Sequence, residues 1–134
     1  MKVLKQMLAI ALVAILPALV SARWHPRRPA PPGEGEIEIS VVRAWKKPVL
    51  WIDARPAPDY AREHVPGALS LNEDAWDAGI SEVVLRANGS VPLIVYCGAD
   101  CNASAQVAHR LRQMGLQPVY VLKGGWETWK RDHP

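Results

Sequence analysis

The sequence predicts an α/β protein with a mainly parallel, five-stranded sheet and helices on both faces of that sheet. Two observations predict this class. Apolar, strand-like runs alternate with helical patterns along the chain, and proline or glycine lies near the points where helices would begin and end. The 134 residues, 49% of them hydrophobic, suffice for one domain with a substantial core. In such sheets, ligands bind at the carboxyl ends of the strands.

Five short segments have the apolar character of strands. They are residues 37–40 (IEIS), 49–53 (VLWID), 67–72 (GALSLN), 91–96 (VPLIVY) and 118–122 (PVYVL). The fourth segment is apolar almost throughout, as expected for a buried strand. Alternation of these segments with helices favours parallel pairing.

Helices are predicted between the strands. Segment 56–64 begins with a proline, which fits a first helical turn, and residues 72–90 combine an acidic start with a glycine-containing end. Residues 104–114 have a helical period that Gly115 ends, and 124–131 form a last short helix. The expected apolar face of the 104–114 helix comprises Val107, Ala108, Leu111 and Met114.

Residues 1–22 have the pattern of an export signal. Lys2 and Lys5 precede an apolar run over 7–20, and small residues at the positions that a signal peptidase reads predict cleavage after Ala22. An uncleaved membrane anchor is the alternative, but the run is shorter than the roughly 20 apolar residues of a spanning helix. In both cases we expect the domain outside the cytoplasm, either periplasmic or secreted.

The Pro-rich segment 23–35 is predicted to be a linker before a domain at 36–131, because it contains almost no large apolar residues. The formal net charge is +3, from 16 Lys and Arg against 13 Asp and Glu; without Lys2 and Lys5, 14 basic residues leave a net charge of +1. This balance does not favour nucleic-acid binding. We expect a monomer with no stable membrane contact once the signal is cleaved.

Cys97 lies between a predicted strand and a predicted helix, at a turn where backbone N–H groups converge. Such a loop stabilises the thiolate, which is the reactive form of cysteine. Gly98 and Ala99 permit a tight turn, and Ser104 can add a hydroxyl or cap the helix. A purely structural thiol is the alternative. We expect this thiol at the surface end of its strand, where it contributes little to core packing.

Four motifs occur in a fixed order along the chain. They are Asp-x-Arg at 53–55, His-x-Pro-Gly-Ala at 64–68, Cys97 after a strand, and Gly-Gly-x-x-x-Trp at 124–129. Together they resemble the rhodanese-like domain family over roughly residues 36–131. This resemblance implies an α/β fold and sulfurtransferase chemistry on a persulfidated Cys97.

The resemblance also assigns roles to other residues. It implies that the loop after Cys97 binds a small-molecule sulfur donor, whose sulfur passes to a thiol acceptor. The substrate-binding residues would be Gly98, Ala99, Asp100, Cys101, Asn102, Ala103 and Ser104. Residues matching Asp53, Arg55 and His64 brace the strand end and the following turn. Neither a cofactor nor a metal site is expected, since no Cys/His spacing suits a metal.

The loop departs from the usual family pattern in length and charge. The stretch from Cys97 to Ala103 is one residue longer than usual and contains Asp100 but no basic residue. A thiosulfate dianion would therefore find less compensating charge. Phosphatases of this fold have a nucleophilic cysteine that is followed by five residues and then an arginine. Counted from Cys97, that arginine would be residue 103, which is Ala, so phosphatase activity is not expected.

Cys101 leaves several alternatives open. It can form a disulfide with Cys97, resolve a persulfide or sulfenate there, or simply fill the floor of the loop. The function accordingly has two alternatives to a sulfurtransferase: a binding module that uses the fold without turnover, and a thiol redox protein that uses both cysteines.

Aromatic and histidine side chains are expected to have mainly structural positions. Packing roles are predicted for Trp45, Trp51, Trp76, Trp126 and Trp129. Either of the last two could also form a wall of the active-site mouth. His109 points away from the apolar face of its helix, which predicts an exposed side chain.

Overall fold

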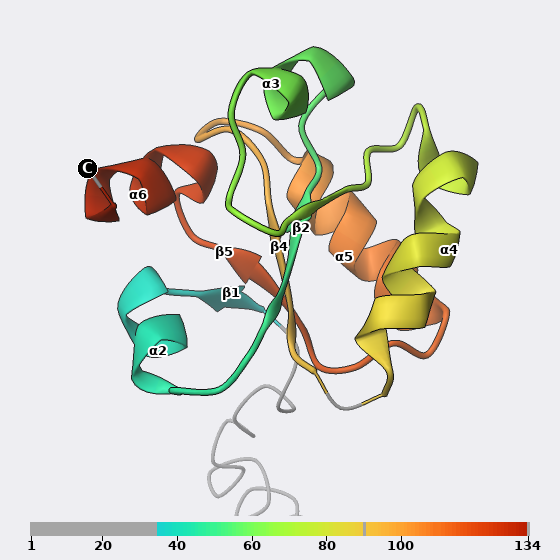
Figure 1. The fold of residues 1–134 in the computed structure, drawn as a ribbon, viewed down its shortest axis with the longest axis horizontal. Helices are drawn as coiled ribbons and strands as arrows, with labels where there is room; N and C mark the ends of the chain where they lie inside the picture. Colours follow the sequence, from blue (N-terminus) through green and yellow to red (C-terminus); the bar gives the residue numbers. More distant parts are fainter. Residues whose placement is uncertain (1–34, 90, 134) are drawn as a thin grey trace, which may run out of the picture.

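Five strands form one parallel sheet in the computed structural model of the chain, which describes residues 35–89 and 91–133 (Figure 1). The strands are β1 (Glu36–Ile37), β2 (Leu50–Asp53), β3 (Leu69–Ser70), β4 (Leu93–Tyr96) and β5 (Val119–Leu122). Their order across the sheet is β1-β5-β4-β2-β3, and every neighbouring pair is parallel. The predicted fold class is confirmed.

The register of the central strands brings two polar strand ends together. Asp53 of β2 aligns with Tyr96 of β4, so both strands end at the same level. Ala54, directly after β2, donates its backbone N–H to Tyr96 O at 2.8 Å. Cys97 follows Tyr96 and therefore lies at the carboxyl edge of the sheet, the edge where sheets of this kind bind ligands.

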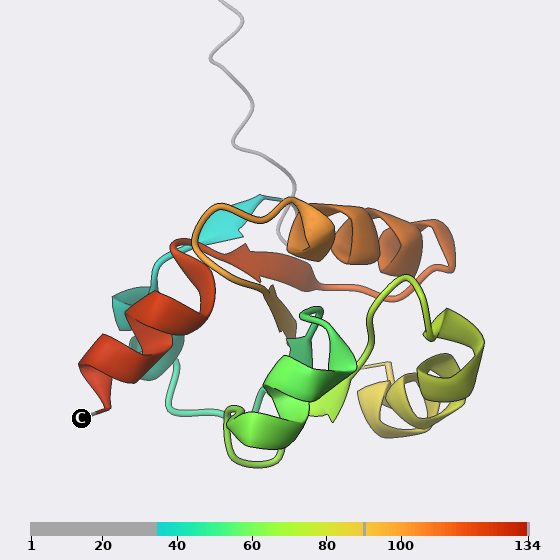
Figure 2. The same ribbon diagram turned by 90° about the horizontal axis from the view of Figure 1, so that it is seen from above.

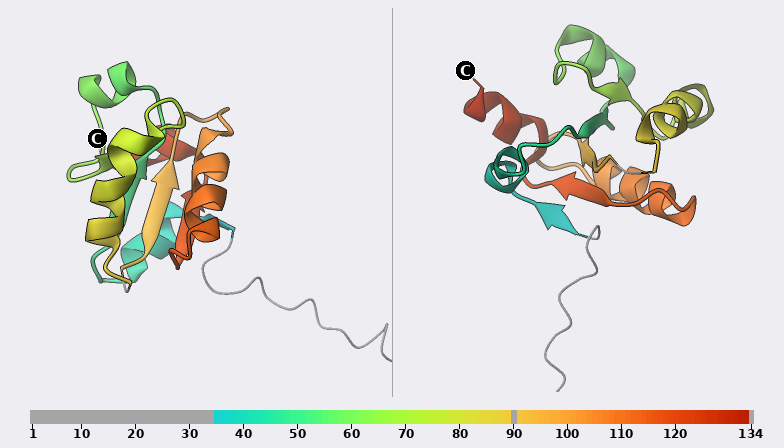
Figure 3. Two further views of the ribbon diagram at one scale, coloured as in Figure 1. Left: turned by 90° about the vertical axis from the view of Figure 1, so that its right-hand side faces the viewer. Right: turned by 60° about the horizontal axis from the view of Figure 1, so that its bottom comes forward.

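Helices cover both faces of the sheet. They are α2 (Ile39–Ala44), α3 (Ala57–Arg62), α4 (Trp76–Ala87), α5 (Ala103–Gln113) and α6 (Gly125–Asp132). α4 and α5 lie on one face and α2 and α6 on the other, while α3 lies at the carboxyl end of the strands (Figures 1 and 2). In the left view of Figure 3, β4 is visible between α4 and α5.

Each face of the sheet has its own hydrophobic cluster, because successive strand residues point to opposite faces. The cluster beneath α4 and α5 contains Leu50, Ile52, Ala54, Leu71, Trp76, Val83, Ala87, Leu93, Val95, Cys97, Val107, Ala108, Leu111 and Val119. The cluster beneath α2 and α6 contains Ile37, Val42, Val65, Ala68, Ile94, Tyr96, Leu122 and Trp126. Burial of each large aliphatic side chain contributes about 1.5–3 kcal/mol, which holds the helices on the sheet.

The tryptophans pack as predicted. Trp76 is buried in the first cluster and Trp126 in the second. Partly buried tryptophans at the second cluster are Trp45, Trp51 and Trp129. His109 is exposed, also as predicted.

The start of the described chain differs from the prediction. Residues 37–40 were expected as a strand, but β1 ends at Ile37 and α2 begins at Ile39. β1 is an edge strand that pairs only with β5, and Ile37 already aligns with Leu122, the last residue of β5. With no partner beyond that point, the chain continues in a helix whose buried residue is Val42.

The end of α5 confirms the role of Gly115 but not that of Met114. Gly115 has φ +84°, its N–H donates to Arg112 O at 2.9 Å, and the N–H of Leu116 donates to Leu111 O at 3.2 Å, which together form a Schellman motif. Met114 is the C-cap residue and is 51% exposed. Leu116 packs against the first cluster in its place, because the Gly115 turn directs the chain back to the core.

The predicted export signal at 1–22 and the linker at 23–35 lie, apart from Gly35, outside the described residues. Across residues 35–89 and 91–133, no helix has the length and apolar character needed to cross a membrane. The predicted boundaries of the signal, linker and domain therefore stay predictions.

Candidate active site

Cys97 directly follows β4, but its thiol is not on the surface. Only 2% of the residue is exposed, and it belongs to the cluster beneath α4 and α5. The expectation that this thiol contributes little to packing is therefore wrong. Two backbone bonds fix this stretch: Trp126 donates its N–H to Cys97 O at 2.8 Å, and the loop turns back with the N–H of Cys101 bonded to Gly98 O at 3.3 Å.

Gly125 makes the first of these contacts possible. Its φ is +53°, a conformation that favours glycine, and a Cβ there would overlap the carbonyl oxygen of Cys97. The Gly-Gly pair of the sequence motif thus brings the start of α6 against the residue that follows β4. Two segments far apart in the sequence fix the backbone of Cys97 in this way.

The Cys97 sulfur has mainly acceptors around it. The thiol lies 2.9 Å from Cys101 O, 3.5 Å from Gly98 O and 3.2 Å from the hydroxyl oxygen of Ser104. Burial, followed by the neighbouring Cys101 thiol, raises the pKa of Cys97, while the hydroxyl and backbone N–H of Ser104 act to lower it. The expected approach of backbone N–H groups to this sulfur is found in part. Among the described residues, the N–H of Ser104 acts on it, beside the carbonyl oxygens of Cys101 and Gly98, which stabilise the thiol.

The remaining predicted loop residues separate into three groups. Gly98 is half-buried and lines a cleft described below. The next four residues are exposed: Ala99, Asp100, Cys101 and Asn102. Ala103 is the half-buried first residue of α5, and Ser104 is buried beside the sulfur. The predicted hydroxyl contact of Ser104 is confirmed, but its capping role is wrong, because Asn102 is the N-cap residue and makes no side-chain cap bond.

Cys101 presents the second thiol of the loop. Both cysteines are free, and Cys101 is exposed whereas Cys97 is buried. The backbone N–H of Ala103 donates to the Cys101 sulfur at 3.3 Å. Cys101 thus accepts a backbone N–H from the start of α5.

A buried polar network braces the ends of β2 and β4. The Asp53 carboxylate, which is fully buried, accepts from the Arg55 guanidinium at 2.6 Å and from the Tyr96 hydroxyl at 2.8 Å. The backbone N–H of Arg55 adds a third bond to Asp53 at 2.9 Å. The implied bracing role of Asp53 and Arg55 is confirmed. Sequence reasoning missed Tyr96, although a phenol that ends a buried strand needs a partner.

The same network holds the turn of the His-x-Pro-Gly-Ala motif. Val65 donates its N–H to the Tyr96 hydroxyl at 3.1 Å, and Arg55 donates to Glu63 O at 2.7 Å. His64 Nδ1 lies 2.8 Å from Tyr60 O, and its ring stacks on Tyr60 with centroids 3.9 Å apart. These contacts give His64 a bracing position, as the resemblance implied.

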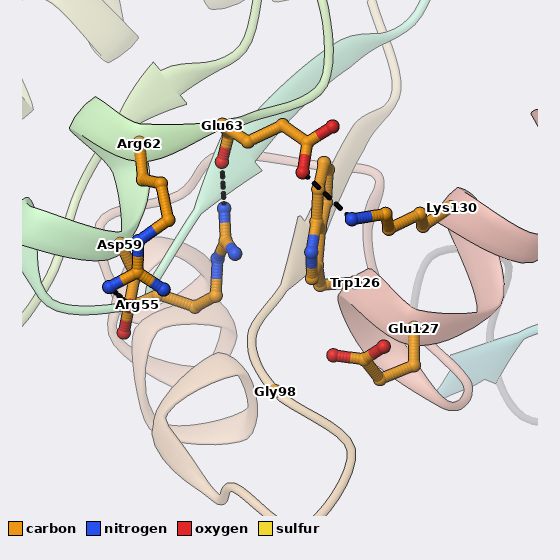
Figure 4. A pocket seen from close by; sticks show the side chains of 8 residues that line it. All are labelled: Arg55, Asp59, Arg62, Glu63, Gly98, Trp126, Glu127 and Lys130. Atoms are coloured by element: carbon orange, nitrogen blue, oxygen red, sulfur yellow. Dashed lines mark hydrogen bonds and ion pairs between the residues drawn. The ribbon is translucent and has the colours of Figure 1, made fainter. Parts of the chain in front are cut away.

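Residues 98–102, between Cys97 and α5, are here called the active loop. A cleft of about 360 Å³ opens beside this loop (Figure 4). It is lined by Arg55, Asp59, Arg62, Glu63, Gly98, Trp126, Glu127 and Lys130. The Arg55 guanidinium lies over the Trp126 ring at 4.5 Å. Arg62 pairs with Asp59 at 3.4 Å, and Lys130 pairs with Glu63 at 3.0 Å. The cations of the cleft are thus neutralised by neighbouring acids.

Gly98 is the one residue of the active loop that lines this cleft, and Cys97 does not line it. A Cβ at Gly98 would meet nothing within 4 Å, so open space adjoins the loop there. Trp126 is both part of the core and a wall of the cleft, which combines the two roles considered for it. The charged lining of α3 and α6 was missed, because only the fold brings these helices together.

Within the described residues, no group of three or more His, Cys, Asp or Glu side chains could hold a metal ion. The arrangement instead offers thiol chemistry. A buried thiol and an exposed thiol share one loop, next to an open cleft and above a braced strand end.

Comparisons with known proteins agree on the family. The sequence model of the rhodanese-like domain matches residues 42–132. The thiosulfate sulfurtransferase GlpE of Coxiella burnetii is 36% identical over 101 residues, which are 72% of this chain and 90% of that protein. The BH2092 protein of Bacillus halodurans is 26% identical with a TM-score of 0.58, covering 72% of each chain. A rhodanese-like domain protein of Staphylococcus aureus shares the fold, with 22% identity and a TM-score of 0.56. That match covers 72% of this chain and 91% of the Staphylococcus chain.

Proposed function

The chain belongs to the rhodanese-like domain family and is a sulfurtransferase of that family, and we propose that Cys97 holds the transferred sulfur as a persulfide. The position of Cys97 supports this assignment. It directly follows the central strand, at the carboxyl edge where the network of Asp53, Arg55 and Tyr96 fixes the backbone. The adjacent residue Gly98 borders a cleft that a small donor can enter.

The proposed reaction has two exchange steps and no net redox change. The Cys97 thiol first loses its proton, and the thiolate attacks the sulfane sulfur of the donor. A sulfur–sulfur bond forms to Cys97, and the bond between that sulfur and the rest of the donor breaks, with the electron pair leaving on the donor remnant. An acceptor thiolate then attacks the outer sulfur, becomes a persulfide, and releases Cys97 as a thiolate. The chemistry requires no cofactor.

The charge around the loop favours a donor that is not a dianion. Three cationic and three acidic side chains line the cleft, and the exposed Asp100 adds another negative charge in the loop. A doubly charged donor gains most from an excess of cations, which this lining lacks. We therefore propose a sulfane donor of low charge, such as an organic persulfide, and slow turnover of thiosulfate, the substrate that the name of the Coxiella relative states.

Intact mass measurement tests the carrier assignment. The purified protein is exposed to an organic persulfide and, separately, to thiosulfate, and we expect the gain of one sulfur atom that maps to Cys97 and is absent in Cys97→Ser. Absence of an adduct with every donor would instead indicate a binding module. A loss of two hydrogens that a reductant reverses would indicate a redox protein that uses both cysteines.

Export is a separate proposal that concerns residues outside the described part of the chain. The pattern of residues 1–22 supports cleavage after Ala22, and the mature protein would then act in the periplasm or outside the cell. N-terminal sequencing of protein from the periplasmic or secreted fraction should begin at Arg23. An intact Met1 in a washed membrane fraction would mean an anchor.

A further inference from the structure

The loop that follows Cys97 joins a buried thiol to an exposed one. The Cys97 sulfur faces inward, in the cluster beneath α4 and α5, with Cys101 O 2.9 Å away. The Cys101 side chain is exposed and receives the N–H of Ala103 at 3.3 Å. The two thiols also interact, since the Cys101 side chain contributes to the raised pKa of Cys97. A buried thiol and an exposed thiol therefore adjoin within one short loop.

Cys97 belongs to the buried cluster that also contains Val95 and Val107, while its sulfur lies 2.9 Å from Cys101 O and 3.5 Å from Gly98 O. The sulfur thus has loop backbone, including that of Cys101, within hydrogen-bond distance. An outer sulfur on Cys97 would extend on this loop side, where Cys101 lies. A large acceptor cannot reach a sulfur held below this loop, because Cys97 itself is 2% exposed and does not line the cleft.

The geometry points to Cys101 as a second catalytic thiol, which takes the outer sulfur from the Cys97 persulfide and presents it on the surface to an acceptor protein. This inference rests on the proposed function, because Cys97 must first be loaded. It adds an internal transfer between loading and release, and it names large thiol acceptors, meaning exposed cysteines of folded proteins, as the class that depends on that transfer.

The internal step is balanced without an oxidant or reductant. The Cys101 thiolate attacks the outer sulfur of the Cys97 persulfide, a sulfur–sulfur bond forms at Cys101, and the bond to Cys97 breaks with its electron pair on the Cys97 sulfur. The Cys97 thiolate takes up the proton that Cys101 lost. The acceptor thiolate then attacks the outer sulfur on Cys101. Two thiols held in one loop make the first transfer effectively unimolecular, which favours it over attack by a bulky thiol from solution.

The test compares a large and a small acceptor on the same loaded protein. Wild type and Cys101→Ser are loaded with an organic persulfide, and release is timed to cyanide and to reduced serum albumin with its exposed thiol. We expect the ratio of the albumin rate to the cyanide rate to fall by on the order of tenfold or more in Cys101→Ser. A general loss of activity lowers the albumin rate and the cyanide rate by the same factor, so it leaves their ratio unchanged. Ala105→Ser, an exposed substitution in the first turn of α5, should keep the wild-type ratio.

Location of the sulfur provides a second readout. In loaded wild type, alkylation followed by fragmentation between residues 97 and 101 should find sulfane sulfur on both cysteines, and Cys97→Ser should leave Cys101 unloaded. An unchanged rate ratio in Cys101→Ser overturns the relay, as does a fall of equal size in Ala105→Ser. Loading of Cys101 at the wild-type rate in Cys97→Ser also overturns it. Release of hydrosulfide together with formation of a Cys97–Cys101 disulfide also overturns the relay. That product requires the Cys101 thiolate to attack the Cys97 sulfur of the persulfide and not its outer sulfur. Wild type that never gains sulfur on Cys97 overturns the proposed function and the relay together.

Discussion

At the scale of single residues, the direction of the Cys97 side chain determines its chemistry. A thiol among carbonyl oxygens and core residues is stabilised in its protonated form. Cys97 has this environment, and burial raises its pKa. The proposed sulfur transfer on Cys97 therefore begins with loss of a proton.

The raised pKa of Cys97 predicts how loading depends on pH. Because burial keeps the thiol protonated, the loading rate should rise about tenfold per pH unit through neutrality and continue to rise above pH 8.5, near which an unperturbed thiol levels off. Loading rates with an organic persulfide from pH 6 to 10, followed by mass spectrometry, measure this profile. A plateau reached below pH 8 would contradict it.

The same pKa shift predicts a loss of stability at alkaline pH. A group whose pKa is raised in the folded state stabilises the protein below its unfolded pKa, and this contribution is lost as pH rises toward the folded value. Burial raises the pKa of both Cys97 and Tyr96, so both act in this direction. The free energy of unfolding should therefore fall above about pH 8.5, the unfolded thiol pKa. Urea titrations of wild type and Cys97→Ala should show a smaller alkaline loss in the variant.

Asp100 carries a prediction about donor charge. Its carboxylate is exposed in the loop that follows Cys97, so it repels a dianionic donor without being part of the packing around the sulfur. Asp100→Arg should raise kcat/KM for thiosulfate several-fold, with a gain that shrinks as salt screens the charge. Turnover of an organic persulfide, the proposed donor of low charge, is the internal control and should gain less. An equal gain for both donors would mean that charge is not the cause.

At the scale of elements, the first residues of α6 fix the position of Cys97, directly after β4. α6 begins at Gly125, where a Cβ would overlap Cys97 O, and Trp126 holds that oxygen through its N–H. Cys97 is therefore fixed by a segment that is separated from it in the sequence by another helix and strand. The Gly-Gly-x-x-x-Trp motif has this physical meaning in the present fold.

Gly125→Ala should destabilise the protein more than a substitution that adds only backbone strain. The matched control is Gly89→Ala, whose φ of +74° is also positive but whose Cβ would meet nothing within 4 Å. The control should lose about 1–2 kcal/mol of unfolding free energy from its left-handed backbone. Gly125→Ala should lose more and should also slow sulfur loading on Cys97. Equal losses in urea unfolding, with normal loading, would contradict the positioning role.

At the scale of the whole molecule, the sequence predicted what depends on local pattern. Most strand runs, helix ends such as Gly115, and the parallel character of the sheet follow from propensity, periodicity and the alternation of strands with helices. The inward direction of Cys97 and the charged cleft were not predictable, because they arise where α3, α6 and the loop after β4 meet. Contacts between distant segments have no local pattern, so the candidate site was recognised by its cysteine, by the bracing residues Asp53 and Arg55 and by Ser104, but not by the cleft or by the burial of the thiol.

The Asp53 network provides the sharpest test of how the whole molecule is held together. Asp53→Asn leaves the Arg55 guanidinium, whose side chain is 10% exposed, without its anionic partner, and it weakens the bonds that join β2, β4 and the turn at Val65. Removal of one member of a buried ion pair costs about 3–5 kcal/mol.

Glu82→Gln is the matched control, because it breaks a Glu–Arg pair that is exposed on α4 and should cost less than about 1 kcal/mol. Urea unfolding of both variants measures the difference, and a loss for Asp53→Asn as small as that for Glu82→Gln would mean that the hydrophobic clusters alone hold the carboxyl edge in place. With the larger loss, we also expect slower sulfur loading, because Tyr96 and Cys97 are consecutive residues on the strand that this network fixes.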